Sequence, residues 1–249
     1  MISVIMGVHV VDDYLLNAIN SILHQSFSEI ELLVVANGKD CHIIEQYINS
    51  NIKDDRLVIL KSKIPQLAYS LNLAIDNAKY KYIARMDSDD ISYPNRLRRQ
   101  LNYLLENNLD MVGSNVRLID ESGNSIGSRI APKGRAINKK IPFGSTFIHP
   151  SCMYKKDLII KARGYNSGFN SEDYDLWLRL KRLNISWDNM NEILLDYRIH
   201  TKASQRALIG YAESAGYAMR EFILRKSLTN FIAIFYHLLK SFIRSKKKY

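Results

Sequence analysis

Two acidic motifs carry the residues whose types and spacing most clearly suggest chemistry. The first is Asp87-Ser88-Asp89-Asp90, which directly follows the apolar segment Tyr82 to Met86. Three carboxylates at the end of a buried strand repel one another unless a cation lies between them. Mg²⁺ is usually held by one or two carboxylates together with substrate phosphates, and Mn²⁺ favours the same oxygen ligands. The motif therefore favours a metal–diphosphate site, with a solvated acidic turn before the next helix as the alternative.

The second motif is Ser171-Glu172-Asp173-Tyr174-Asp175-Leu176-Trp177. Acidic residues at the start of a helix commonly cap it and interact with its dipole, and that structural explanation applies here. The alternative is a general base, because a carboxylate within hydrogen-bond reach can take the proton of an attacking hydroxyl. Both explanations stay open on the spacing of this motif alone.

Other phosphate-binding and nucleophile motifs are absent from the sequence. It has no GxxxxGK[ST] loop and no GxGxxG fingerprint, so a nucleotide would be held by metal and acidic residues instead of a glycine-rich loop. No Ser-His-Asp triad is signalled. The two cysteines, Cys41 and Cys152, form neither a CxxC pair nor a metal-ligand spacing, which is typical of reduced thiols in a cytosolic protein.

The composition is that of a globular chain with a basic charge balance. The chain has 249 residues, of which 47% are hydrophobic and 24% charged, enough for one sizeable core and too few charges for wholesale disorder. The formal net charge of +10 favours polyanionic partners, namely nucleic acid, an anionic membrane surface or phosphate-bearing substrates. Charge does not choose among these three.

Short apolar segments alternate with helical patterns in the first half of the chain. The predicted strands are 3–8, 31–35, 57–60, 82–86 and 111–113, with helical spacing between them. Such alternation predicts a parallel sheet with right-handed crossovers, and ligands bind such sheets at the carboxyl ends of the strands. The acidic motif at Asp87 follows the fourth predicted strand and so falls at this edge.

The second half changes character after Asp120. A polar, basic segment extends to Pro150, and we expect a hairpin around Ser122-Gly123-Asn124 followed by a loop. Helical patterns return at 155–162 and 173–183, a late strand is predicted at 193–198, and helix follows to the end. No boundary between two independent domains is evident.

The C-terminal segment has the pattern of a basic amphipathic helix. One face carries Phe231, Ile234, Phe235, Leu238 and Phe242, and the other carries His237, Lys240, Arg244, Lys247 and Lys248. This pattern predicts a helix lying in a membrane interface, while packing of the apolar face on the rest of the protein is the alternative. The N-terminus has no signal-peptide pattern and no apolar run reaches roughly twenty residues, so we expect a cytoplasmic protein.

Five segments, in this order along the chain, resemble family 2 of the glycosyltransferases, which has the GT-A fold. They are 3–6, 31–35, 82–90, 149–151 and 172–177, and the resemblance extends from Ile2 to about His200. It implies an α/β fold with a Rossmann-like, mostly parallel sheet flanked by helices. It also implies a catalytic domain at 1–204, with a nucleotide-sugar half at 1–118 and an acceptor half at 119–204, before a membrane-associating helical segment at 205–249.

The resemblance also implies roles for particular residues. Asp89 would bind Mn²⁺ or Mg²⁺, with Asp87 beside it against the ribose or a metal-bound water, and Asp173 would be the base of an inverting displacement. The residues that fall where the family contacts the nucleotide are His9, Asn37, Gln66 and Asn72. The family usually has two acidic residues where this chain has Ala36-Asn37 and an aromatic residue at the position of His9, but the amide oxygen of Asn37 can still accept a hydrogen bond.

Five further residues have both a functional and a structural explanation. His149 and Trp177 would help to form the acceptor side, or they belong to the surrounding core. Glu172 lies beside the expected base. Arg198 and His200 would neutralise charge on the leaving diphosphate, or they are polar residues that follow a strand.

The implied reaction moves a hexose from a UDP-sugar to an undecaprenyl-diphosphate-linked saccharide in bacterial O-antigen or surface-polysaccharide synthesis. A β-1,3-galactosyl- or glucosyltransferase acting on a lipid-linked N-acetylglucosamine is the narrower expectation. The enzyme would lie peripherally on the anionic cytoplasmic face of the inner membrane, and no nucleic-acid partner is expected. The alternatives are a nucleotidyltransferase, which also uses carboxylates and Mg²⁺, and a non-catalytic basic nucleic-acid-binding module.

Overall fold

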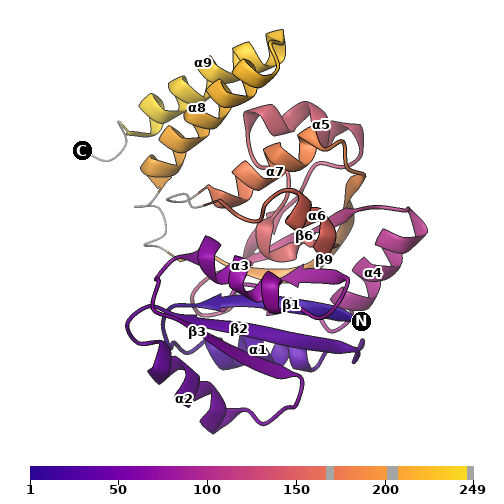
Figure 1. The fold of residues 1–249 in the computed structure, drawn as a ribbon, viewed down its shortest axis with the longest axis vertical. Helices are drawn as coiled ribbons and strands as arrows, with labels where there is room; N and C mark the ends of the chain where they lie inside the picture. Colours follow the sequence, from indigo (N-terminus) through magenta and orange to yellow (C-terminus); the bar gives the residue numbers. More distant parts are fainter. Residues whose placement is uncertain (167–170, 201–206, 246–249) are drawn as a thin grey trace.

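The computed structural model describes residues 1–166, 171–200 and 207–245, and Figure 1 shows how their elements are arranged. The first strands and helices form one end of the molecule, and two long C-terminal helices lie at the opposite end. The expected division of the chain after residue 204 falls outside the described residues.

Four parallel strands form the first part of the sheet, which confirms the prediction from the alternating segments. Their order is β3 (Leu57–Ser62), β2 (Ile30–Asn37), β1 (Ile2–Val8) and β4 (Tyr82–Arg85). The helices between them in sequence are α1 (Leu15–Leu23), α2 (Cys41–Asn51) and α3 (Leu67–Asn77). Because all four strands run the same way, their carboxyl ends meet at one edge.

The rest of the sheet is mixed, and here several expectations were incomplete. Beyond β4 the order is β8 (Met153–Lys155), β6 (Met111–Ile119), β9 (Trp187–Arg198) and β5 (Ile91–Ser92), and β7 (Ser125–Arg129) pairs with β6. β8 runs antiparallel to both β4 and β6. The prediction missed β8 and β5 because strands of three and two residues are too short to show an alternating pattern.

The polar segment after Asp120 is more ordered than the predicted loop. The expected hairpin is present, since β6 and β7 flank the turn at Gly123. The loop prediction was wrong beyond it, because α5 (Arg135–Lys140) and the short helices η1 (Ile141–Phe143) and η2 (His149–Ser151) follow. The remaining helices before the C-terminal pair are α4 (Arg96–Glu106), α6 (Lys156–Lys161) and α7 (Glu172–Arg182).

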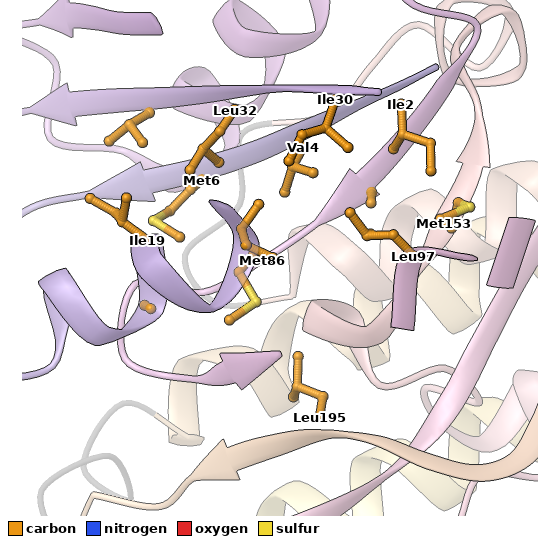
Figure 2. Close-up of a cluster of buried hydrophobic side chains, with 14 of the residues drawn as sticks. Ile2, Val4, Met6, Ile19, Ile30, Leu32, Met86, Leu97, Met153 and Leu195 are labelled. Carbon is orange, nitrogen blue, oxygen red and sulfur yellow. The ribbon is translucent and has the colours of Figure 1, made fainter. Parts of the chain in front are cut away.

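The core lies on both faces of the parallel strands, as expected for a sheet that helices cover on each side. On one face, Ile2 and Met6 of β1 pack with Ile19 of α1 and Leu97 of α4, and Figure 2 shows this cluster. On the other face, Ile5 belongs to a second cluster that contains the apolar side chains of α3 and α7. The two clusters fix the sheet between helices, so the carboxyl edge of the strands is held rigidly.

The C-terminal helices, α8 (Ala207–Leu224) and α9 (Leu228–Ser245), form a hairpin that packs on α7 and η1. The expectation that His237 lies on the exposed polar face was wrong. His237 is 2% exposed, and its Nε2 lies 3.0 Å from the Pro142 carbonyl oxygen and 3.2 Å from the Tyr174 hydroxyl. A narrow strip of α9 with Ala233 and Ile234 is buried beside it. The hairpin is therefore docked on the domain.

Most of the apolar surface of α9 nevertheless stays exposed. More than half of the exposed large hydrophobic side chains in the described residues lie on the α8–α9 hairpin. On α9 they are Leu228, Phe231, Ile232, Phe235, Tyr236, Leu238, Leu239, Phe242 and Ile243. Within the described residues, no helix has the length and apolar character needed to cross a membrane. One strip of α9 thus packs on the domain, as the alternative explanation predicted, while a wider surface faces outward and membrane contact stays a prediction.

Candidate active site

The carboxyl edge of the parallel strands brings together several of the predicted site residues. His9 follows β1, Asn37 ends β2 and Asp87 follows β4. The Nδ1 atom of His9 lies 3.2 Å from Oδ1 of Asn37. Gly38 makes this approach possible, because its φ is +91° and a Cβ atom there would lie 2.9 Å from the His9 ring. His9 and Asn37 thus form one polar pair at the end of β1 and β2.

Of the other two predicted nucleotide contacts, Gln66 lies directly before α3, at the same edge, and is half-buried. Asn72 has a structural task. Its Nδ2 donates to the Tyr165 carbonyl oxygen and its Oδ1 accepts from the Tyr165 N–H, each at 2.8 Å. The side chain of Asn72 therefore ties the segment after α6 to α3, and contact of Gln66 or Asn72 with a nucleotide stays a prediction.

The three carboxylates after β4 form a compact acidic cluster. One oxygen from each of Asp87, Asp89 and Asp90 lies within 4.8 Å of the others. Asp90 is buried, and its Oδ2 has no hydrogen-bond partner among the described residues. Burial raises the pKa of the Asp90 carboxyl well above its usual range, and the charges of Asp87 and Asp89 add to that rise. A buried oxygen without a partner and a hard oxygen donor set fit a divalent cation.

His200 completes this cluster from the far end of the sheet. Its Nε2 lies 2.7 Å from Oδ2 of Asp89. Burial and the charge of Asp87 raise the pKa of the Asp89 carboxyl, while the contact with His200 opposes the rise. An imidazole nitrogen at this place is a further donor that Mn²⁺ or Mg²⁺ would meet beside Asp89.

Arg198, two residues before His200, is hydrogen-bonded to the acidic cluster. The backbone N–H of Arg198 donates to Oδ1 of Asp90 at 2.9 Å, and its Nε donates to the Asp89 carbonyl oxygen at 2.9 Å. Its guanidinium also lies over the Tyr14 ring, 4.0 Å from the ring centroid. The Arg198 side chain is thus bound to the backbone around the acidic cluster, and its contact with a leaving diphosphate stays a prediction.

Arg85 is a functional candidate that the sequence reasoning missed. It ends β4, is 2% exposed, and its Nη1 forms an ion pair with Asp87. Burial by itself lowers the pKa of the guanidinium, but the charge and hydrogen bond of Asp87 outweigh this and raise it. The available signal was an arginine within the apolar segment Tyr82 to Met86, since a buried arginine requires a paired charge.

The second acidic motif begins α7 and lies within the electrostatic reach of the first. Glu172 and Asp173 are in the first turn of α7, and Oδ1 of Asp173 accepts from the Tyr174 N–H at 2.7 Å. Burial raises the pKa of Asp173 and the charge of Arg85 opposes the rise. Burial and the charge of Asp173 raise the pKa of Glu172 to about 7, and Asp87 also contributes. Arg85 thus acts on both motifs.

The wall next to this site is a buried aromatic network. Nε2 of His149 lies 2.8 Å from the Tyr165 hydroxyl, which in turn lies 3.0 Å from the Tyr154 hydroxyl. Burial lowers the pKa of His149 well below its usual range, with a further contribution from Arg85, so the ring is neutral. Trp177 is 0% exposed and packs against Phe147 and His149. This placement favours the core explanation for Trp177 and a hydrogen-bonded wall position for His149.

Replacing Arg85 tests whether this cation balances the acidic cluster. Arg85→Met removes one partner of a buried ion pair and should lower the free energy of unfolding by about 3 kcal/mol. Because a divalent cation would then relieve more carboxylate repulsion than in the parent protein, Mn²⁺ should raise the melting temperature of Arg85→Met by more. Calorimetric melting with and without Mn²⁺ measures both effects.

The matched control is Arg179→Met, which removes another buried arginine, one that pairs with Asp175 and does not contact the acidic cluster. This control should be destabilised but should show the Mn²⁺ shift of the parent protein. Equal Mn²⁺ shifts in Arg85→Met and the parent would show that Arg85 does not balance the cluster.

Known proteins resemble this chain in sequence over most of its length. The O-antigen biosynthesis glycosyltransferase WbnJ of Escherichia coli is 49% identical over 247 residues, which is 98% of this chain and 97% of WbnJ. The Escherichia coli UDP-Gal:alpha-D-GlcNAc-diphosphoundecaprenol beta-1,3-galactosyltransferase is 29% identical over 222 residues, covering 85% of this chain and 79% of that enzyme.

Solved structures show the same fold at lower sequence identity. The crystal structure of S. aureus TarS 1–349 superposes with a TM-score of 0.68 at 17% identity, covering 99% of this chain and 73% of that one. The complex of the same protein with UDP-GlcNAc gives a TM-score of 0.63 at 15% identity, covering 98% and 81%. The GT-A fold expected from the sequence is thereby confirmed.

The sequence profile of the family described as Glycosyl transferase family 2 matches residues 3–162. The match includes all four parallel strands and the acidic cluster after β4. Together with the 49% identity to a glycosyltransferase over nearly its full length, it confirms the resemblance first seen in five short segments: the chain belongs to glycosyl transferase family 2.

Proposed function

We propose that this glycosyltransferase moves a hexose from a UDP-sugar to a saccharide on a lipid diphosphate, in the synthesis of a bacterial O-antigen or related surface polysaccharide. The observation that carries the proposal is the acidic cluster with His200 at the carboxyl edge of the sheet, within electrostatic reach of Glu172 and Asp173. A metal–diphosphate site next to a buried carboxylate is what direct glycosyl transfer requires.

The donor half of the proposal rests on the polar groups around the first four strands. His9 and Asn37 would hold the uracil, with the Asn37 amide oxygen accepting from the imide N–H. Gln66 would contact the nearby nucleotide, and Asp87 the ribose or a metal-bound water. When bound, Mn²⁺ or Mg²⁺ at Asp89 would offset the negative charge of the leaving diphosphate.

The chemical step belongs to α7. Asp173 takes the proton of the acceptor hydroxyl as that oxygen forms a bond with the anomeric carbon. The bond between this carbon and the diphosphate oxygen breaks, UDP leaves with the electron pair, and the configuration at the anomeric carbon inverts. The charge of Arg85 opposes the effect of burial on the pKa of Asp173, which favours the ionised carboxylate that a base requires.

The relatives support the acceptor class, because one is named for O-antigen biosynthesis and another for transfer to a diphosphoundecaprenol-linked N-acetylglucosamine. A β-1,3-galactosyl- or glucosyltransferase onto such an acceptor is accordingly our narrower proposal. Membership in family 2 disfavours the nucleotidyltransferase and nucleic-acid-binding alternatives. The released product separates the enzymatic alternatives, since sugar transfer releases UDP and nucleotidyl transfer releases diphosphate.

A transfer assay tests the reaction as a whole. The purified protein, UDP-galactose or UDP-glucose, Mn²⁺ and a synthetic N-acetylglucosaminyl diphosphate lipid should yield UDP and a disaccharide lipid. Excess EDTA should abolish the product, and Asp89→Ala should remove nearly all turnover because the diphosphate loses its metal ligand. Full activity in EDTA, or release of inorganic diphosphate instead of UDP, would contradict the proposal.

The role of Asp173 is tested by a change that keeps its shape. Asp173→Asn should lower kcat by about 10²–10⁴-fold while calorimetry shows unchanged UDP binding, because Asp173 serves the acceptor. Burial raises the pKa of Asp173. As the pH is lowered, the parent enzyme should therefore begin to lose activity at a higher pH than an ordinary aspartate base would allow.

Glu172→Gln is the matched control for this experiment, because it removes the neighbouring carboxylate and leaves Asp173. It should keep most of kcat and leave the acidic limb of the pH profile nearly unchanged, because Glu172, with a pKa of about 7, is already neutral where Asp173 titrates. If instead Glu172→Gln loses activity and Asp173→Asn does not, Glu172 is the base.

A lipid-linked acceptor is confined to a bilayer surface, and the hairpin supports a location there. The outward surface of α9 combines exposed aromatic and aliphatic side chains with a C-terminal segment rich in lysine, a combination typical of helices that lie in a membrane interface. We therefore include peripheral binding to the anionic cytoplasmic face of the inner membrane in the proposed function. Deletion of α9 is a poor test, because it would also remove the buried contacts of His237.

Surface substitutions test membrane contact without disturbing the docked strip of α9. The triple variant Leu239→Ser, Phe242→Ser, Ile243→Ser changes side chains that are each more than 60% exposed. It should sediment much less with vesicles containing phosphatidylglycerol and should lose activity on the long-chain acceptor, yet keep activity on a short water-soluble analogue.

The matched control is Ile43→Ser, which changes an equally exposed side chain of α2 at the other end of the molecule. It should bind vesicles like the parent protein. Unchanged vesicle binding by the triple variant would overturn membrane contact, and its conversion from dimer to monomer in gel filtration would instead assign this surface to a second copy.

A further inference from the structure

A cavity of about 820 Å³ lies at the far end of α7 from the expected base. Its walls come from α5, η1, one side of α7 from Tyr174 to Arg182, and the α8–α9 hairpin around its junction. Asp173 is in the first turn of α7 and Lys181 in the last, so about 12 Å of helix separates them at 1.5 Å per residue. None of the residues in the acidic cluster or the donor site lines this cavity, so it is a separate place.

The cavity carries an excess of positive charge. The charged side chains that line it are Lys139, Lys181, Arg182, Glu221 and Arg225. Glu221 is already occupied, because its Oε1 binds both Arg182 and Arg220. Within the described part of the chain, the side chains of Lys139, Lys181 and Arg225 have no hydrogen bond or ion pair. Three cations thus line one cavity without a carboxylate within hydrogen-bonding distance.

Lys181 is half-buried and is held at an energetic disadvantage that an anion would remove, whereas Lys139 and Arg225 are exposed. Burial lowers the pKa of Lys181, and the charge of Arg225 lowers it further, although Glu221 acts in the opposite sense. The buried indole of Trp187 is also part of the wall, and its Nε1–H has no acceptor among the described residues. Ser227 and Thr229 at the beginning of α9 complete this side. The half-buried Lys181 ammonium and the Trp187 indole N–H both favour an anionic ligand.

The remainder of the lining is apolar and indicates what the anion is attached to. Leu178, Ile185 and Ala218 form part of the wall, and exposed Leu224 lies at the rim. Ile223 and Leu228, which flank the turn next to that rim, are also exposed. The volume is within the range of small-molecule sites and exceeds what an inorganic anion needs. A ligand that fits this cavity would place a negatively charged end among the cations and an apolar end at the apolar rim. Such a ligand is an amphiphile.

We propose that this cavity binds the phosphate headgroup of an anionic membrane lipid, with Lys181 and Arg225 as its main contacts. The proposal rests on the membrane docking in the proposed function, since the rim belongs to the same apolar hairpin surface. It adds a lipid-specific site to a surface that otherwise attracts any anionic membrane. The bound headgroup would fix the depth and rotation of the hairpin in the interface.

Binding of single lipid molecules isolates the cavity from general attraction to a charged bilayer. Isothermal titration with dihexanoyl-phosphatidylglycerol below its micelle concentration should show one site per chain, while dihexanoyl-phosphatidylcholine should show none. In the double variant Lys181→Gln, Arg225→Gln, affinity should fall at least tenfold, because hydrogen bonds to charged groups are the strong ones. Inorganic phosphate should bind at least tenfold more weakly than the lipid.

The matched control is Lys226→Gln, Lys240→Gln, which removes the same charge from the same hairpin but does not line the cavity. It should bind the monomeric lipid like the parent protein. The proposal would be overturned by an equal loss of affinity in both double variants or by no binding to the parent protein. It would also be overturned if inorganic phosphate bound as tightly as the lipid, because the cavity would then belong to a soluble anion.

Turnover on the water-soluble acceptor separates this proposal from the proposed function. Lys181 and Arg225 lie outside the donor and base sites, so the cavity variant should keep that activity and the melting temperature of the parent. The lipid titration measures binding and does not depend on turnover. Absence of transferase activity would therefore contradict the proposed reaction without changing the result of the titration.

Discussion

Carboxylates that gather within 4.8 Å of one another at a buried sheet edge repel, and each keeps its charge only if cations lie close by. The chain supplies one buried cation, Arg85, on one side of the cluster. Residues at the end of β9 contact the cluster from the other side. Arg85 ends the strand beneath Asp87, while Asp90 accepts the backbone N–H of Arg198 and Asp89 meets His200. These contacts join the fourth strand to the end of β9, more than a hundred residues later. The carboxylate charge is therefore balanced by groups from distant parts of the sheet. A bound divalent cation would neutralise the negative charge that these groups leave.

The mixed part of the sheet explains how the second acidic motif reaches this balance. β8 inserts antiparallel between β4 and β6, and the segment that leads into β8 carries Phe147 and His149. These pack against Trp177 of α7, so the helix that begins with Glu172 and Asp173 is supported from below. Arg85 then acts on both motifs, which links the acidic cluster and the start of α7 through one buried charge.

The sequence predicted what depends on regular patterns. Buried parallel strands show continuous apolar runs, so β1 to β4 and the acidic cluster at their edge were found correctly, as was α7. Short elements carry too few residues to show a period, and β8, β5 and α5 were missed for that reason. The partners of buried polar groups were also beyond reach. His237 fell on the polar side of a helical projection, and only the packed structure shows it bonded to Pro142. Arg85 and Asn72 gained their tasks from residues distant in the sequence, which no local pattern reveals.

The helix α7 belongs to two neighbourhoods at once. Its first turn holds the expected base, its last turn lines the basic cavity, and Asp175 near its start is bonded to Arg220 of α8. A single rigid rod therefore sets the distance between the reacting centre and the hairpin surface. In the proposed docking on a bilayer, that distance would set the one height above the lipid phosphates at which an acceptor hydroxyl can react. Acceptor saccharides one sugar too short or too long would then be discriminated by reach, even when every contact to the terminal sugar is satisfied.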